Sequence, residues 1–248
     1  MEFLLVNQPK KKPAEIQPEA GMTYASPAIH DRRRRILEET RKMIAERGLA
    51  GFSMDEIGKR AGVAKRTLYN AYQTKERMIA IAIHEYFERY LTHIPYTGPV
   101  GSLQRNVERM VFVVNRNRQL RNYISALMSI YFSVEADSDI WTTMHSMAVE
   151  SNLQWINSMK AKRQLQPWVD PQQLADDVVR LEYSIINDWS RGNIDDDDVV
   201  LHVVSACLTL ACGAARGAAR KQIEDMLQEL HTTGIPQPAL PTARKRKS

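Results

Sequence analysis

The segment Phe52–Met78 reads FSMDEIGKRAGVAKRTLYNAYQTKERM and contains the start and stop signals of two short helices in close succession. Ser53 precedes Glu56 by three residues, which is the spacing of a capping box, so a helix is predicted over Met54–Ala61. A glycine directly after this helix ends it, and a second helical period follows over Lys65–Tyr72. Two short helices joined by a turn of about three residues form a helix-turn-helix.

The sequence on both sides of this segment also has helical periodicity. Before it, apolar residues recur at every third or fourth position from Asp31 until Gly48 stops the helix. After it, Thr74 caps a further helix with a wide apolar face, which Pro95 and Gly98 break. Three helices followed by a long linking helix are therefore predicted.

This part of the chain closely resembles the DNA-binding domain of TetR-family transcriptional regulators. The matching features are Ser53, Ile57, the turn Ala61, Gly62 and Val63, the helix residues Thr67, Leu68 and Tyr69, then Tyr72, and the pair Lys75 and Glu76. The resemblance extends from His30 to Tyr90. It implies a DNA-binding domain over residues 30–90, with the helix-turn-helix motif at 53–72.

The third helix has a face that suits the DNA major groove. If Leu68 and Tyr72 point to the core, the outer arc of this helix carries Lys65, Arg66, Thr67, Tyr69 and Asn70. Arg66 can bridge guanine O6 and N7, Asn70 can pair with adenine or contact a phosphate, and Thr67 can touch a thymine methyl group. An isolated set of such charges would more often be a solvated basic face. Inside a complete helix-turn-helix, we favour DNA contact.

The resemblance adds further contacts. It implies that Ser53, Tyr69 and Lys75 hold phosphates, and Ser53 and Lys75 stand at helix N-termini, where backbone amides favour an anion. It also implies that the cluster Arg32–Arg35, with Arg33 and Arg34 at its centre, lies along the DNA backbone or in the minor groove.

Two departures from the family pattern bear on the choice of DNA sequence. Ala64 stands where the family often has a Ser or Thr that contacts phosphate, so this contact is missing. Asn70 and Ala71 stand where His and an aromatic residue are common. The operator should therefore differ from that of regulators with the usual residues.

The remainder of the chain also has helical patterns and no alternating run long enough for a sheet. Helices are predicted near Ser102–Arg116, Gln119–Phe132, Ile140–Ala161, Gln172–Arg191 and Val199–His231. The expected fold is all-α, with the N-terminal helix-turn-helix domain joined by the linking helix to a larger helical domain over residues 99–231.

The resemblance implies that this larger domain dimerises and binds a ligand. Gln172–Arg191 and Val199–His231 would pack across the two-fold axis, and a run of small residues permits close approach, although packing within one chain is the alternative. That run contains Ala206, Ala211, Gly213, Ala214, Ala215, Gly217, Ala218 and Ala219.

Methionine and aromatic side chains in the same domain can line a pocket for an apolar effector, although a stripe at helical spacing is more often plain core. The candidate lining residues are Met110, Val114, Met128, Tyr131, Phe132, Met144, Met147 and Trp155. His145, Asn152 and Asn187 can supply polar contacts.

Charge is distributed unevenly along the 248 residues. The formal net charge of +5 lies entirely within residues 1–93, which hold 17 basic and 12 acidic residues, whereas residues 94–248 are neutral overall. This asymmetry is typical of a protein in which only one part meets a polyanion. Residues 1–29 and 232–248 are expected to be a disordered basic arm and a disordered basic tail.

Several classes of protein are disfavoured. No apolar stretch approaches the ~18 residues of a membrane span, and two cysteines favour a reducing cytoplasm over a secreted disulfide scaffold. Cys207 and Cys212 would lie on different helix faces, and Asp195–Asp198 resembles no calcium loop, so we expect no metal. No nucleophile elbow, phosphate loop or zinc-protease signature appears, so neither an enzyme nor a cofactor is expected.

The function that we expect is that of a cytoplasmic homodimeric repressor. It would bind a palindromic double-stranded DNA operator and be released by a small apolar ligand. The alternative is a DNA-binding architectural or cell-cycle factor that a protein partner regulates. Whether the protein represses or activates depends on the position of the operator.

Overall fold

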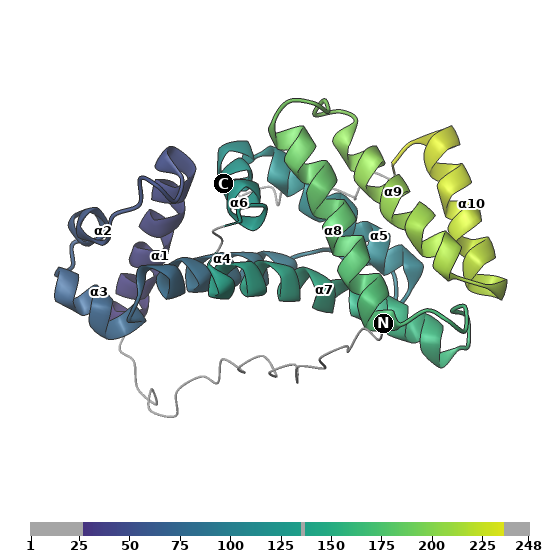
Figure 1. Ribbon diagram of the computed structural model, residues 1–248, viewed down its shortest axis with the longest axis horizontal. Coiled ribbons are helices and arrows are strands. Elements are labelled where there is room, and N and C mark those ends of the chain that lie inside the picture. Colours follow the sequence, from purple (N-terminus) through teal and green to yellow (C-terminus); the bar gives the residue numbers. More distant parts are fainter. Residues whose placement is uncertain (1–26, 135–136, 236–248) are drawn as a thin grey trace, which may run out of the picture.

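The computed structural model describes residues 27–134 and 137–235. Within these residues the secondary structure consists of ten α-helices and no strand, which confirms the predicted all-α class (Figure 1). The described residues also contain no helix that is long and apolar enough to cross a membrane.

The first four helices agree closely with the sequence pattern. They are α1 (Pro27–Arg47), α2 (Met54–Ala61), α3 (Lys65–Tyr72) and α4 (Lys75–Leu91). Helices α1 to α3 form a small bundle at one end of the molecule, and α4 runs from this bundle toward the other helices (Figure 1). Helix α1 begins at Pro27, so residues 27–29, which we assigned to the disordered arm, are helical. The predictions for residues 1–26 and 236–248 lie outside the described residues.

Six helices make up the rest of the described chain. They are α5 (Leu103–Arg118), α6 (Arg121–Tyr131), α7 (Ser138–Ala161), α8 (Pro171–Ser190), α9 (Val199–Ala214) and α10 (Gly217–Thr233). Helix α8 packs against α7 and α9, and α10 packs against α9 at the end of the molecule opposite α2 and α3 (Figure 1). Residues 232–233, which we assigned to the tail, belong to α10.

The single helix predicted over Val199–His231 is wrong, because the chain breaks between α9 and α10. Ala215 is extended and pairs with Leu165 in an isolated antiparallel bridge. The amide of Arg216 donates to the carbonyl of Gln164 at 2.8 Å, and Gly217 has a φ of +58°. Helical hydrogen bonds at the break are thus replaced by bonds to the loop after α7, a long-range partner that local periodicity does not reveal.

The two parts of the fold share one continuous apolar core. Helix α1 packs against α6, and α4 packs against both α1 and α7. Ile44 of α1, Ile83 of α4 and Val114 of α5 are all fully buried in this core. The helix-turn-helix is therefore attached to the remaining helices by packing as well as by the chain.

Candidate nucleic-acid interface and internal cavity

The turn between α2 and α3 depends on two glycines. Gly62 ends α2 in the left-handed conformation (φ +67°), and the amide of Val63 donates to the carbonyl of Gly58 at 2.9 Å. A Cβ atom on Gly58 would lie 2.9 Å from the carbonyl oxygen of Val63. Gly58 thus allows the close approach that sets α3 against α2. We did not single it out in the sequence, although a glycine inside a short helix is a signal of such an approach.

This packing presents one face of α3 to solvent. Leu68 and Tyr72 are buried in the core, as the periodicity predicts, and burial raises the pKa of Tyr72 to about 12. The exposed face carries Lys65, Arg66, Tyr69 and Asn70, with Thr67 half-buried beside them. All five residues predicted to face the major groove are therefore brought together.

Lys65 and Arg66 are neighbours with different surroundings. The ammonium group of Lys65 pairs with Asp55 of α2 at 2.8 Å, and this interaction raises the pKa of Lys65. The same ammonium lies 6.0 Å from the centre of the Tyr69 ring. In contrast, the side chains of Arg66 and Asn70 have no hydrogen bond or ion pair to any described residue. Arg66 and Asn70 are thus free to contact an outside partner.

The arginine cluster at the start of α1 divides in the same way. Arg33 donates through Nε to Glu85 of α4 at 2.9 Å, and Arg34 pairs with Asp31 at 2.9 Å. Arg32 and Arg35 are exposed and have no ion pair to a described residue. Arg33 and Arg34, which we named as central, therefore form ion pairs inside the protein. Arg32 and Arg35 do not pair with a described residue.

The predicted capping box at Ser53 is only half formed. Ser53 Oγ accepts from the amide of Glu56 at 3.4 Å, but the amide of Ser53 points to the sulfur of Met43. The Glu56 carboxylate instead bonds to Arg47 and Arg60, and these bonds lower its pKa. The error arose because these arginines compete for the carboxylate from α1 and from the next turn of α2.

Two helix N-termini near α3 have the predicted character. Thr74 caps α4 by accepting from the amide of Arg77 at 3.0 Å, which leaves Lys75 in the first turn, 3.5 Å from the Glu76 carboxylate. Ala64 precedes α3 and provides no side-chain cap, in agreement with the missing hydroxyl noted above.

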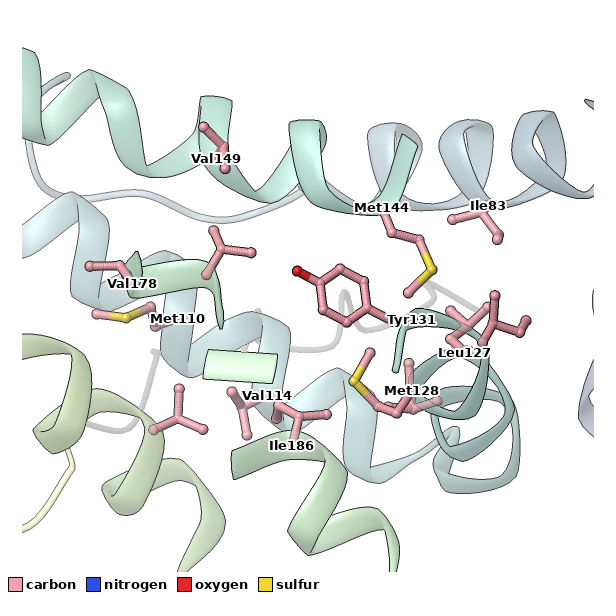
Figure 2. Close-up of a cluster of buried hydrophobic side chains, with 14 of the residues drawn as sticks. Ile83, Met110, Val114, Leu127, Met128, Tyr131, Met144, Val149, Val178 and Ile186 are labelled. Carbon is pink, nitrogen blue, oxygen red and sulfur yellow. The ribbon is translucent and has the colours of Figure 1, made fainter. Parts of the chain in front are cut away.

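A cavity of about 60 Å³ lies between α4, α5, α6, α7 and α8. The wall includes three residues of the linking helix, Ile83, Phe87 and Leu91. It also includes Met128 and Met144, which point toward each other near Tyr131 in Figure 2, and the neighbouring Met147. Three of the eight candidate pocket residues thus line a cavity that touches the linking helix.

The other five candidates do not line this cavity. Met110, Val114, Tyr131 and Trp155 are buried in the surrounding core. Phe132 is 47% exposed at the end of α6, so its assignment to a pocket is not supported by its position. Helical spacing identified the buried stripe but did not separate cavity wall from close-packed core.

Two charged residues in the wall were missed. Arg109 of α5 and Glu182 of α8 are 6% and 3% exposed, and both line the cavity. Burial raises the pKa of Glu182, and the charge of Arg109 opposes this effect. The signal was present in the sequence, since each charge occupies an apolar position of its helix, next to Met110 and between Val179 and Ile186 respectively.

Of the proposed polar contacts, His145 and Asn152 are buried and Asn187 is half-buried. Asn152 bonds to Arg109 at 2.8 Å, whereas His145 bonds to Tyr131 at 2.7 Å and to Asp176 at 3.0 Å. None of the three lines the cavity.

No metal site is formed by the described residues. They contain no group of three His, Cys, Asp or Glu side chains placed to hold an ion. Asp196 and Asp197 pair with Arg121 and Arg118 at 3.2 and 3.1 Å. Burial raises the pKa of the Cys207 thiol.

Comparisons with known proteins agree with this geometry. Residues 36–80 match the family model of bacterial regulatory proteins of the tetR family. No curated protein matches the chain.

Solved structures with a similar fold cover most of the chain. A putative TetR-family transcriptional regulator from Rhodococcus sp. is 18% identical, with a TM-score of 0.59, over 73% of this chain and 98% of its own. Salmonella enterica GusR is 24% identical, with a TM-score of 0.55, over 82% and 98%. Pseudomonas aeruginosa NalD, described as the secondary repressor of the MexAB-OprM multidrug efflux pump, is 18% identical, with a TM-score of 0.52, over 76% and 98%.

Proposed function

Because this chain is a TetR-family regulator with the family's DNA-binding motif, we propose that it is a cytoplasmic homodimeric repressor that binds a palindromic operator and releases it when a small molecule binds. The observation that carries the proposal is the exposed face of α3. Arg66 and Asn70 have no hydrogen bond or ion pair to a described residue there; the Arg66 guanidinium can donate to guanine O6 and N7, and the Asn70 amide can both donate to and accept from adenine. NalD, a repressor of similar fold, supports repression as the outcome.

Phosphate contacts would place α3 in the groove. Tyr69 lies on the exposed face, and Ser53 at the start of α2 and Lys75 in the first turn of α4 flank it. Backbone amides at these helix ends favour a phosphate. Arg32 and Arg35 would add contacts at the start of α1, and Arg33 and Arg34 would join them only by leaving Glu85 and Asp31.

Two copies of the chain would each place an α3 in a successive major groove, roughly 34–36 Å apart or more. We propose that α8 and α9 form the interface. On α9, Leu210 and Gly213 are exposed and Ala206 is half-buried, so this face has apolar and small side chains available for close contact.

Release would act through the cavity. Its wall contains Ile83, Phe87 and Leu91 of α4, and the start of the same helix packs into the core of the helix-turn-helix through Met78 and Ile79. A ligand that enlarges the cavity would move α4 and change the spacing of the two α3 helices. Helix α6 offers a second route, because it lines the cavity through Met128 and packs against α1.

Selection from random duplexes followed by fluorescence anisotropy tests the DNA-binding part of this proposal. Replacing Tyr69 and Lys75 with Ala should weaken binding to every duplex. Loss of the lysine should also reduce the slope of log affinity against log salt concentration by about one unit. Arg66→Ala should weaken operator binding by about 1–3 kcal/mol and reduce the sequence preference chiefly at one base pair. Lys162→Ala, an exposed lysine beyond α7, is the matched control and should bind like the original protein. Unchanged affinity of the Tyr69 and Lys75 variant would contradict the proposal.

A further inference from the structure

Two charged residues that line the cavity described above, Arg109 and Glu182, have incomplete hydrogen bonding. Arg109 Nη2 donates to Asn152 Oδ1 at 2.8 Å and to Asn106 Oδ1 at 3.4 Å, but Arg109 Nε has no hydrogen-bond partner among the described residues. Glu182 Oε2 is also buried without a partner. Buried donors and acceptors are nearly always paired, so an unpartnered donor and an unpartnered acceptor on two residues that line one cavity point to a bound group.

The two residues do not satisfy each other. No salt bridge of 4.0 Å or less joins Arg109 to Glu182. A group located between them can therefore accept from Arg109 Nε and donate to Glu182 Oε2. The formal charges of the guanidinium and the carboxylate cancel, so an uncharged group preserves the balance, whereas an added ion would leave a net buried charge.

The remaining wall limits the size and shape of the occupant. It is mostly apolar, and three of its residues, Met128, Met144 and Met147, have flexible and polarisable side chains that adapt to different shapes. The volume of about 60 Å³ is smaller than a single aromatic ring requires, so a ring enters only when the flexible methionine side chains move aside. Figure 2 shows the side chains of Met128 and Met144 pointing toward each other near Tyr131.

We propose that this cavity binds a small uncharged amphipathic molecule whose single polar group, a hydroxyl or an equivalent donor and acceptor, bridges Arg109 Nε and Glu182 Oε2. The apolar body of the molecule packs against the three methionines and against Ile83 and Phe87 of α4. This inference rests on the ligand response in the proposed function and specifies its chemistry. It replaces the purely apolar effector that the sequence led us to expect.

The test is calorimetric titration of the full-length protein, without DNA, with four single-ring probes. Phenol both accepts and donates, anisole only accepts, benzoate accepts and carries a charge, and toluene has no polar group. We expect phenol to bind at least about tenfold more tightly than each of the others. Equal affinities for phenol and toluene would overturn the inference, since ordered water would then satisfy the two charged groups. Tighter binding of benzoate would overturn it as well.

Variants locate the polar contacts. Arg109→Met and Glu182→Leu should each remove the preference of phenol over toluene, and Arg180→Met, an exposed arginine of α8, should keep it. Circular dichroism checks that each variant is folded. If a cavity variant does not fold, the probe series on the unaltered protein still decides the matter.

A parallel measurement separates this inference from the proposed function. Anisotropy of a selected operator is followed while phenol or toluene is added. If phenol binds selectively but the operator stays bound, the inference holds and the proposed release fails. If phenol and toluene release the operator equally, the proposed function holds and the polar contact is wrong.

Discussion

At the scale of single residues, the exposed face of α3 combines free and occupied cations. Arg66 has no hydrogen bond or ion pair to a described residue, whereas Lys65 pairs with Asp55 at 2.8 Å. Binding of Lys65 to a phosphate would require the exchange of one anion for another. Asp55 also places a negative charge near the position expected for the DNA backbone, so it opposes binding by repulsion.

Replacing Asp55 with Asn should therefore raise the affinity for DNA. We expect an increase of about two- to fivefold at low salt for operator and random duplex alike, because the freed lysine contacts phosphate and carries no sequence information. Anisotropy titrations at several salt concentrations measure this effect. Asp225→Asn on α10 makes the same charge change at the far end of the molecule and should leave the affinity unaltered. Weaker binding by Asp55→Asn would show that Asp55 has another role.

The residue scale also shows what sequence can and cannot predict. Periodicity placed Leu68 inward and Arg66 outward, because a helix of known phase fixes the direction of its side chains. It could not predict the partners of Lys65 or Arg33, which belong to other helices and depend on packing. The same limit applies to Arg109 and Glu182, whose shared cavity is formed by helices far apart in the chain.

At the scale of the elements, the join between α3 and α4 is strained. Gln73 has φ +65° and ψ −57°, and the amide of Thr74 donates to the carbonyl of Tyr72 at 2.8 Å. This is a γ-turn with positive φ, a conformation that residues with a side chain rarely adopt. The turn sets the direction of α4 relative to α3, so the strain lies between α3 and the linking helix.

Gln73→Gly should stabilise the protein by about 1 kcal/mol. Relief of roughly 1–3 kcal/mol of backbone strain outweighs the added freedom of the unfolded chain, which costs about 0.4–1 kcal/mol. Thermal and urea unfolding measure the difference. Gln119→Gly is the matched control, since Gln119 ends α5 at φ −73° and gains nothing from glycine. A lower midpoint for Gln73→Gly would refute the strain argument.

Helix positions were the most predictable part of the fold. The bounds of α2 followed from Ser53 and Gly62, and the start of α4 followed from Thr74, because caps and stops act locally. The break between α9 and α10 was missed because it depends on Leu165 and Gln164, some fifty residues earlier in the chain. Local signals therefore define where helices end, except where a distant backbone segment takes over the hydrogen bonds.

At the scale of the whole molecule, the continuous core joins the helix-turn-helix to the cavity-bearing helices. Ile83 is the clearest example, since it is fully buried in the shared core and also lines the cavity. All four tryptophans lie outside the first 93 residues, at positions 141, 155, 168 and 189. Tryptophan fluorescence thus reports on the larger part of the fold, and far-UV circular dichroism reports on all the helices.

The shared core predicts a single unfolding transition at the same denaturant concentration for both signals. Ile83→Ala should lower the free energy of unfolding by about 2–5 kcal/mol and shift both signals together. Ile29→Ala, at an exposed position of α1, should shift neither by more than about 0.5 kcal/mol. Two separated transitions would mean that the helix-turn-helix unfolds on its own.

The pairing of Lys65 with Asp55, together with that of Arg33 with Glu85, has a consequence for the search along the genome. Affinity for arbitrary DNA comes mainly from lysine and arginine on phosphates, and this protein would have to give up internal ion pairs to use Lys65 and Arg33 in this way, as it would for Arg34 and Lys75. We therefore expect short-lived complexes with arbitrary sequence and fast transfer from one stretch of DNA to the next. Arg66 has no ion pair to a described residue, so in the proposed complex its contact with a matching base would need no such exchange and would lengthen the residence time on the operator.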